Sequence, residues 1–260
     1  KKASAKRASR AANATASPTP KAASKQTTSK PAAEKRSSTS VRKPASASAE
    51  AGGGSLAEYN RKRDFTKTTE PAGVPAPRRR GKALQFIIQK HDATQLHYDL
   101  RLELDGVMKS WAVPKGPSAN PANKRLAMHV EDHPVSYNTF EGTIPEGEYG
   151  GGTVMLWDTG TYAPDTSANP AAAKGKSDEE IAREAYERGD FKVVFSGKRM
   201  QGSYVLVRTR GFGGKSSKES WLLIKHRDEF ARDADAEDVT EEFTTSVTTG
   251  RTMEEIAAEG

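Results

Sequence analysis

Hydrophobic and polar residues alternate strictly from Gln95 to Leu104, and this is the clearest pattern in the chain. A period of two predicts a β-strand, because successive side chains of a strand point to opposite faces. One face would direct a tyrosine and four leucines toward a core. The other face would carry four polar side chains in a row, namely His97, Asp99, Arg101 and Glu103. We therefore expect a strand with one packing face and one chemical face.

Further short runs of the same kind, divided by turn residues, predict a β-rich domain. The expected strands lie near residues 85–91, 95–104, 107–112, 125–131, 153–158, 191–195, 203–209 and 220–226. Residues 196–202 should connect a hairpin, and the Gly- and Pro-rich residues 115–121 and 142–152 should form loops. The predicted fold is mainly β, a single compact β-barrel of about eight strands with one or two flanking helices.

One helix is predicted from its end signals. Ser177 is a suitable N-cap, Glu180 stands three residues later as in a capping box, and Gly189 ends the stretch. A second short helix is expected after Thr252, with acidic residues in its first turn. We treat residues 231–260, which contain this helix, as an acidic C-terminal segment or linker.

Composition separates residues 1–55 from the rest. They contain no aromatic residue, and 12 Lys and Arg against two acidic residues give them a net charge of +10. Because the whole chain carries +7, the other 205 residues carry −3. A segment of this composition buries too little apolar surface to offset its conformational entropy. We therefore predict a disordered basic tail over 1–55, followed by a barrel domain over 56–230.

The chain has no cysteine, which excludes disulfides and thiolate metal sites and suits a reducing cytoplasm. No apolar run approaches the ~18 residues of a membrane span, and the N-terminus lacks the hydrophobic region of a secretory signal. The chain begins with Lys1, so a piece of a longer protein is one interpretation.

A candidate metal site lies on the chemical face of the first strand. His97 and Asp99 share this face, and His91 ends the preceding predicted strand, from which a short connection would bring it back beside them. Two imidazoles with one carboxylate favour a divalent transition metal such as Mn, Fe, Co or Zn over Mg. The alternative is a polar strand that faces solvent.

A candidate anion site adjoins it. Arg101 continues the same face, where a guanidinium suits phosphate, although a cross-strand ion pair is an equal alternative. A second polar cluster at 125–134 ends in His133 beside Asp132, and Tyr137 follows it. If the strand stays regular, His129, Glu131 and His133 share one face with Arg125. We predict His133 as the site residue of this cluster, and His129 and His226 as structural.

Two further features invite a phosphate interpretation. Lys115 opens a Gly/Pro loop and could contact phosphate, although an exposed lysine is the usual case. The glycine-rich residues 148–153 lack the Gly-Lys-Ser/Thr ending of a phosphate-binding loop and precede a strand rather than a helix. We interpret them as a turn that lets the backbone pass close to the site.

Three blocks of sequence resemble the 3′-phosphoesterase domain of bacterial DNA ligase D over about residues 60–230. They read QKHDATQLHYDLRLELDGVMKSWAVPKGPS, RLAMHVEDHPVSYNTFEGTIPEGEYGGGTVMLWD and SWLLIKHRDEF. The resemblance implies a β-barrel whose polar interior holds a manganese-preferring metal beside a phosphate site. It also implies 3′-end healing before nonhomologous end joining. The family removes a terminal ribonucleoside to leave a 3′-phosphate, and then removes that phosphate to leave a 3′-OH.

The family motif implies a role for each matching residue. The metal ligands would be His91, His97 and Asp99. The phosphate site would comprise Arg101, His133 and Tyr137, with Lys115 and Arg125 nearby and Glu131 and Asp132 in support. The leading residues Arg63, Asp64 and Glu70 would serve the ribonucleoside step. We add the hypothesis that a protonated His133, paired with Asp132, donates to the leaving 3′ oxygen.

The resemblance further implies partners and a location. These are DNA 3′ ends, ligase and polymerase modules and a Ku-type end-binding protein, with the domain acting as a monomer in the nucleoid region of the bacterial cytoplasm. The chain lacks the Lys-x-Asp-Gly motif of a ligase, since residues 103–106 read Glu-Leu-Asp-Gly, and residues 246–257 resemble the connector to a ligase core.

Two other functions stay open. One is a non-catalytic DNA-binding scaffold that recruits repair factors, although a scaffold needs none of these site residues. The other is an Fe(II) oxygenase with two histidines and one carboxylate. The cationic groups predicted around the site suit phosphate better than an oxygenase co-substrate.

Overall fold

The computed structural model describes residues 55–77, 81–209 and 219–259, so that residues 1–54 of the predicted disordered tail lie outside it. The described part is mainly β, as predicted. Its strands are β1 (Leu84–Asp92), β2 (Leu96–Leu104), β3 (Val107–Val113), β4 (Lys124–Pro134), β5 (Gly142–Ile144), β6 (Gly152–Pro164), β7 (Asp190–Gly197), β8 (Gln201–Arg208) and β9 (Ser220–Lys225). Its helices are α1 (Ala57–Arg61), α2 (Asp178–Arg188), α3 (Val239–Glu242) and α4 (Met253–Ala257), with 3₁₀ turns η1 (Val135–Thr139) and η2 (Pro170–Ala173).

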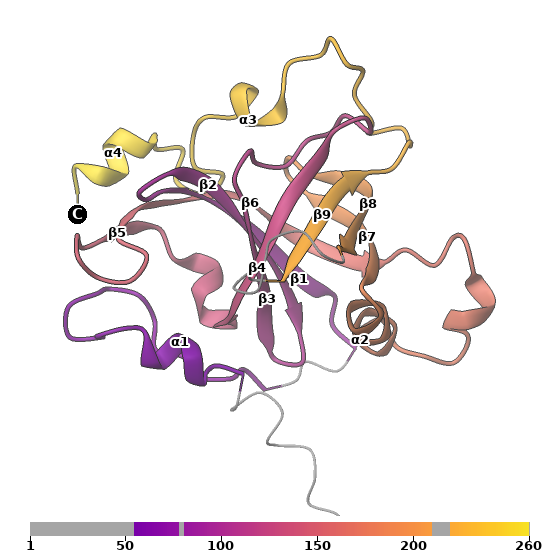
Figure 1. Ribbon diagram of the computed structural model, residues 1–260, viewed down its shortest axis with the longest axis horizontal. Helices are drawn as coiled ribbons and strands as arrows, with labels where there is room; N and C mark the ends of the chain where they lie inside the picture. The colour runs from indigo at the N-terminus through magenta and orange to yellow at the C-terminus, as the bar shows by residue number, and fades with distance from the viewer. Residues whose placement is uncertain (1–54, 78–80, 210–218, 260) are drawn as a thin grey trace, which may run out of the picture. The chain divides into compact units, whose positions relative to one another are not determined.

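The strands form one antiparallel sheet that closes on itself (Figure 1). The order is β1-β2-β3-β4-β9-β8-β7-β6, and β1 pairs again with β6, so that eight strands make a ring while β5 is added beside β6. The predicted eight-stranded barrel is confirmed. The short strand β5 was expected to be loop, because its three residues stand in a Gly- and Pro-rich stretch.

The apolar faces of the strands fill the barrel. Phe86 of β1 lies 4.5 Å from Phe195 of β7, and Trp111 of β3 lies 5.7 Å from Trp221 of β9, measured between ring centroids. Neither pair of strands is hydrogen-bonded, so the sheet must curl around this face. Tyr186 of α2 stacks on Trp221 with an interplanar angle of 12°. The helix thus packs against the same core.

The apolar interior corrects one implication of the family resemblance. A polar barrel interior was expected, but Asp99 and Arg101 lie on the outer face of β2, opposite the apolar side chains. A closed ring of about eight strands has room inside only for its own side chains, and here these are hydrophobic. The two polar residues are nevertheless only 6% and 3% exposed. Tyr59 of α1 and Tyr137 of η1 pack in an apolar cluster that covers this part of the outer face.

Both predicted helices are present. Ser177 caps α2 through a capping box with Glu180, and Gly189 ends it in the left-handed conformation at φ +77°. Thr252 and Glu255 form the same box at α4. The helices α1 and α3 were not predicted, since each spans five residues or fewer and shows no helical periodicity. None of the described helices is long and apolar enough to cross a membrane.

Candidate metal and phosphate site

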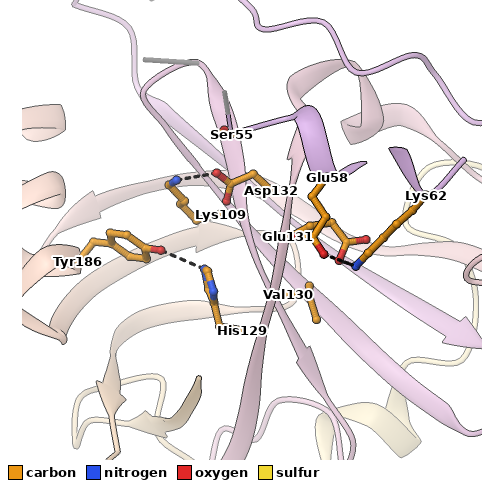
Figure 2. A pocket seen from close by; sticks show the side chains of 9 residues that line it. All are labelled: Ser55, Glu58, Lys62, Lys109, His129, Val130, Glu131, Asp132 and Tyr186. Atoms are coloured by element: carbon orange, nitrogen blue, oxygen red, sulfur yellow. Dashed lines mark hydrogen bonds and ion pairs between the residues drawn. The ribbon is translucent and has the colours of Figure 1, made fainter. Parts of the chain in front are cut away.

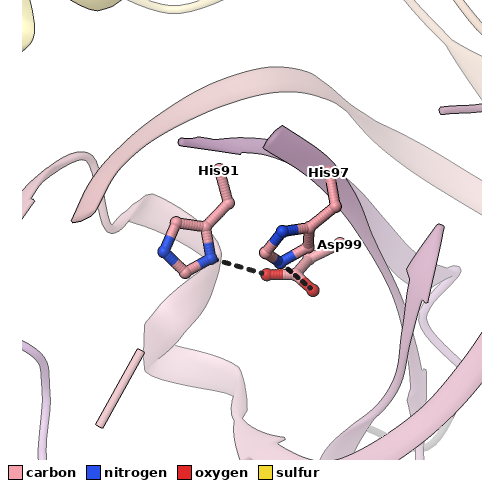
Figure 3. A group of neighbouring side chains, drawn as sticks. All are labelled: His91, His97 and Asp99. Carbon is pink, nitrogen blue, oxygen red and sulfur yellow. Dashed lines mark ion pairs between the residues drawn. The ribbon is translucent and has the colours of Figure 1, made fainter. Parts of the chain in front are cut away.

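A three-residue connection between β1 and β2 builds the predicted metal cluster. The register places His91 directly opposite His97, with Gln89 opposite Asp99. The carboxylate of Asp99 lies 3.5 Å from Nδ1 of His91 and 3.7 Å from Nε2 of His97 (Figure 3). One ligand atom from each residue lies within 4.8 Å of the others, and this group could hold a metal ion.

Backbone carbonyls determine which nitrogen of each imidazole faces the cluster. Nε2 of His91 lies 2.9 Å from the Gly150 oxygen, and Nδ1 of His97 lies 2.9 Å from the Gln95 oxygen. A carbonyl only accepts, so these nitrogens carry the protons. The lone pairs of the other two nitrogens then point toward Asp99, as metal-binding histidines require. The predicted close passage of the glycine-rich turn is confirmed by the Gly150 contact.

Arg101 connects the metal cluster to the anion site. Its Nε donates to Oε1 of Gln89 at 2.9 Å, and one terminal nitrogen donates to Asp99 at 3.0 Å. The other terminal nitrogen, NH1, is buried and has no hydrogen-bond partner. Buried polar atoms are rarely left unpaired, so this nitrogen is a strong candidate to bind a ligand oxygen.

The charge of Arg101 also acts on the cluster. Burial alone would raise the pKa of Asp99, but the neighbouring Arg101 guanidinium outweighs it and holds that pKa well below its usual range. The carboxylate is therefore ionised, the form that binds a cation. Gln89 keeps the guanidinium in place, because its own amide donates to the Phe140 oxygen at 2.9 Å.

A second group of residues faces Arg101 from the leading segment and η1. Oε1 of Glu70 accepts from the Tyr137 hydroxyl at 2.8 Å and from Nε of Arg63 at 3.0 Å. Burial and the Glu70 carboxylate raise the pKa of Tyr137 well above its usual value, so the phenol keeps its proton. Arg63 also lies over the Tyr59 ring, 3.8 Å from its centroid, which restrains its orientation.

His133 is neutral in this arrangement. Its Nδ1 donates to the Glu131 oxygen at 2.9 Å, and its Nε2 accepts from Arg63 at 3.3 Å. Burial and the neighbouring Arg101 and Arg63 lower its pKa well below the ordinary value. The hypothesis of a protonated His133 paired with Asp132 therefore does not describe the resting site.

A bulge in β4 places His129 and His133 on opposite faces of the strand. Met108 of β3 faces His133 of β4, and Ser110 faces Val130. Over this stretch β4 therefore contains one residue more than β3. This bulge breaks the expected parity: His129 faces Trp111 on the inner side, while His133 faces outward.

A cavity of about 390 Å³ joins the metal cluster to the anion site. We call it the site cavity. Its polar lining comprises Arg63, His91, Gln95, His97, Asp99, Arg101, Glu131, His133, Tyr137 and Tyr149. Glu70 lies behind this lining. Most of the predicted site residues thus meet in one place, although they come from three separate stretches of the chain.

A second cavity of about 320 Å³ adjoins the first, and the two share Val130 and Glu131. We call it the charged cavity. Lys109 bonds to Asp132 at 2.7 Å, and Tyr186 lies 3.0 Å from Nε2 of His129 (Figure 2). Asp132, predicted to support the phosphate site, belongs to this cavity instead.

Three more predicted residues lie outside the site cavity. Arg125 forms an ion pair with Asp238 at the opposite end of β4 from His133. Asp64 accepts from the backbone and hydroxyl of Thr66 and so stabilises a turn. Lys115 is exposed and follows Pro114, which does line the cavity.

Three contributing residues were not predicted as site residues. Gln89 orients Arg101, and its parity with His91 was the available signal. Lys62 bonds to Glu131 at 3.1 Å and to the Tyr149 hydroxyl at 3.1 Å. No sequence pattern relates Lys62, Glu131 and Tyr149, because they are 18 to 87 positions apart and meet only through folding.

Comparison with known proteins identifies the family of the barrel. Residues 89–208 match the family described as the DNA ligase D 3′-phosphoesterase domain. The multifunctional non-homologous end joining protein LigD of Pseudomonas aeruginosa is 46% identical over 198 residues, which cover 76% of this chain and 22% of that protein. The corresponding protein of Mycolicibacterium smegmatis is 39% identical over 174 residues, covering 67% of this chain and 21% of its own length.

A third relative is the multifunctional non-homologous end joining DNA repair protein LigD of Mycobacterium tuberculosis, 44% identical over 156 residues, or 60% of this chain and 18% of that protein. The chain thus spans about a fifth of the length of these relatives. The matched segment contains every strand from β2 to β8 and the whole metal cluster. Through this barrel, the chain belongs to the family of DNA ligase D 3′-phosphoesterase domains.

Proposed function

We propose that this domain is a metal-dependent phosphoesterase that heals DNA 3′ ends during nonhomologous end joining. One observation carries the proposal. The unpartnered NH1 of Arg101 lies beside a His-His-Asp cluster in the same cavity. A cation and a guanidinium with a free donor are the two groups that a phosphoryl oxygen needs.

The metal would be held by His91, His97 and Asp99. The mixed nitrogen and oxygen donors favour a transition metal, and we propose Mn²⁺. Such an ion, when bound, polarises a phosphoryl oxygen or lowers the pKa of a bound water. The carbonyls of Gly150 and Gln95 orient the two imidazoles before the ion arrives.

The phosphate would lie between the metal cluster and Arg101. The guanidinium neutralises charge that develops on the phosphoryl oxygens, and its bonds to Gln89 and Asp99 hold it in one orientation. Arg63, His133 and Tyr137 complete the wall. The Glu70 and Glu131 carboxylates lower the net charge of this wall, so that Arg101 is its main anion-binding group.

Two hydrolyses would follow in order. Water first adds across the bond between phosphorus and the 5′ oxygen of a terminal ribonucleoside, which leaves as a free nucleoside and leaves a 3′-phosphate on the strand. A second water then adds across the remaining ester bond, releasing inorganic phosphate and a 3′-OH. The neutral His133 and the protonated Tyr137 act here as hydrogen-bonding groups of the phosphate wall.

The test uses a labelled primer-template that ends in one 3′-ribonucleotide, incubated with Mn²⁺ or with EDTA. The wild-type chain should produce a 3′-phosphate and then a 3′-OH, and EDTA or His97→Ala should abolish both. His226→Ala is a matched control, because His226 bonds to Ser203 away from the site. A chain that binds DNA but forms no product with several metals would contradict the proposal and favour a scaffold.

We also propose that the basic residues 1–55 attach the domain to DNA without sequence preference. Their net charge of +10 would displace counterions from the phosphate backbone. Deleting them should weaken DNA binding and reduce its salt dependence while the site keeps its activity on bound ends. An unchanged salt dependence would contradict this role.

A further inference from the structure

Two large hydrophobic side chains are exposed on the lining of the site cavity. Tyr149 is 41% exposed and Leu96 is 47% exposed, whereas Arg101 is 3% exposed. We call these two residues the mouth. Cavities that combine an apolar mouth with a few buried polar groups are typical of small-ligand sites. Part of the ligand must therefore offer apolar surface to the open side.

The Tyr149 ring is held in place by Lys62, Arg63 and Glu131, while the residue stays 41% exposed. Its hydroxyl lies 3.1 Å from Nζ of Lys62 and 3.4 Å from a carboxylate oxygen of Glu131. The same Lys62 nitrogen lies 4.5 Å from the ring centroid. An anchored ring loses little side-chain entropy when a ligand packs on it. Tyr149 is thus a preorganised surface for a flat group.

Each of the two mouth residues is adjacent in sequence to a residue of the metal cluster or to one that contacts it. Leu96 immediately precedes His97, and Tyr149 immediately precedes Gly150, whose oxygen holds His91. A phosphate bound at Arg101 NH1 and the cluster must therefore have the groups attached to it near the mouth. In a nucleic acid these groups are a sugar and a base. Aromatic rings stack on any base, since every base has a π-face.

The polar groups beside the ring indicate which nucleoside lies there. Glu131 is a buried carboxylate next to the Tyr149 hydroxyl, and carboxylates accept hydrogen bonds from hydroxyls. A 3′-terminal ribonucleoside is the only one on the strand with two free neighbouring hydroxyls. We propose that Tyr149, with Leu96, forms a sequence-tolerant stacking subsite for the base of that terminal ribonucleoside. This inference rests on the proposed function.

The experiment compares the full chain with Tyr149→Ala and Tyr149→Phe on two ends. One primer-template ends in a ribonucleoside, and the other ends in a 3′-phosphate, which has no nucleoside beyond the phosphate. Tyr149→Ala should raise the KM of ribonucleoside removal about tenfold or more and change phosphate removal less than about threefold. Tyr149→Phe keeps the ring and should stay within about threefold on both.

A third substrate isolates the base. On an end that carries an abasic terminal ribose, Tyr149→Ala and the wild type should be equally active, because no base is left to stack. Leu96→Ser should repeat the pattern of Tyr149→Ala with a smaller effect. Phe230→Ala removes an exposed aromatic ring outside the site cavity and serves as the matched control.

Each outcome is decisive. Equal losses on the ribonucleoside and phosphate ends, a loss that persists on the abasic end, or a Tyr149→Phe defect as large as that of Tyr149→Ala would overturn the subsite alone. A wild-type chain that is inactive on all three substrates overturns the proposed function as well. Thermal unfolding of Tyr149→Ala within a few degrees of the wild type supports reading its KM as a binding effect.

Discussion

The site cavity and the charged cavity lie side by side, share Glu131 and are both lined by histidine, tyrosine, lysine or arginine and carboxylates. They differ in which of their charged and imidazole groups are left without a partner. In the charged cavity each charged side chain has an ion-pair partner: Lys62 with Glu58 and Glu131, and Lys109 with Asp132 (Figure 2). In the site cavity two imidazole lone pairs face Asp99, and one buried guanidinium nitrogen of Arg101 has no hydrogen-bond partner.

This difference separates a structural charge cluster from a binding site. In an ion pair, each charged group already has a partner in place of the water that it lost on folding. Such groups stabilise the fold and gain little from binding a ligand. Unpaired buried groups have no such partner, and a ligand that satisfies them recovers the cost of losing that water. Residue types alone would have ranked the two cavities equally. Their hydrogen bonds favour the site cavity.

The largest expected effect comes from removing a charge from the metal cluster. Asp99→Asn keeps the shape of the side chain but removes the anion that faces both histidines and Arg101. Activity should fall about a thousandfold or more, because the metal and the guanidinium lose their common partner. Calorimetry should show weakened Mn²⁺ binding. Full activity with normal metal affinity would contradict the assigned ligand set.

The next effect tests the free guanidinium nitrogen. Arg101→Lys keeps the positive charge but cannot bond to Gln89 and Asp99 and still offer a third donor to phosphate. We expect kcat to fall about a hundredfold while Mn²⁺ affinity changes little. Steady-state kinetics and metal titration on the same sample separate the two. A wild-type kcat would mean that NH1 does not contact the reacting phosphate.

The charged cavity should respond in stability rather than in activity. Asp132→Asn leaves Lys109 without its anion in a mostly buried position. The free energy of unfolding should fall by about 1–3 kcal/mol, while kcat stays within about twofold. Chemical denaturation and kinetics are the two measurements. A hundredfold loss of kcat with unchanged stability would restore Asp132 to the phosphate site.

The double variant Lys109→Met with Asp132→Asn sharpens this test. It removes both charges, so that no unpaired ion is buried, and it should recover part of the lost stability. A double variant that is as unstable as the sum of the two single variants would show that the pair is not coupled.

The smallest effect concerns acid stability. Burial lowers the pKa of His129 from 6.5, so the unfolded chain takes up a proton before the folded chain does as the pH falls. Proton uptake by the unfolded chain lowers the free energy of unfolding. This decrease is absent well above pH 6.5 and grows as the pH drops below it. His129→Gln should therefore show a smaller decrease in Tm between about pH 7.5 and about pH 5.5 than the wild type. Identical decreases in Tm would contradict a buried neutral His129.

Much of the fold was predictable from local patterns. Alternation over Gln95–Leu104 identified β2 and its two faces, and end signals identified α2 and α4. The longer extent of β6 and the bulge in β4 were not predictable. Both depend on partner strands: β6 continues to Pro164 because β1 and then β7 pair with it.

The candidate site was predictable in part for the same reason. The metal cluster lies on one hairpin, so spacing in sequence translates directly into spacing in space. The residues around the proposed phosphate site do not lie on one hairpin, so their sequence spacing does not predict their arrangement. Arg63 and Glu70 of the leading segment meet Tyr137 through side-chain hydrogen bonds that no periodicity describes.

The sequence by itself thus determined most of the strands, the two capped helices, the His91–His97–Asp99 cluster and the family, because each depends on residues close along the chain or on a motif. Only the tertiary structure decided that the chemical face of β2 lies outside the barrel, that Asp132 pairs with Lys109, and that NH1 of Arg101 stays free. These facts depend on the closure of the sheet and on which distant partner satisfies each buried charge. Several distant groups could satisfy the same buried charge, and local sequence does not determine which of them does.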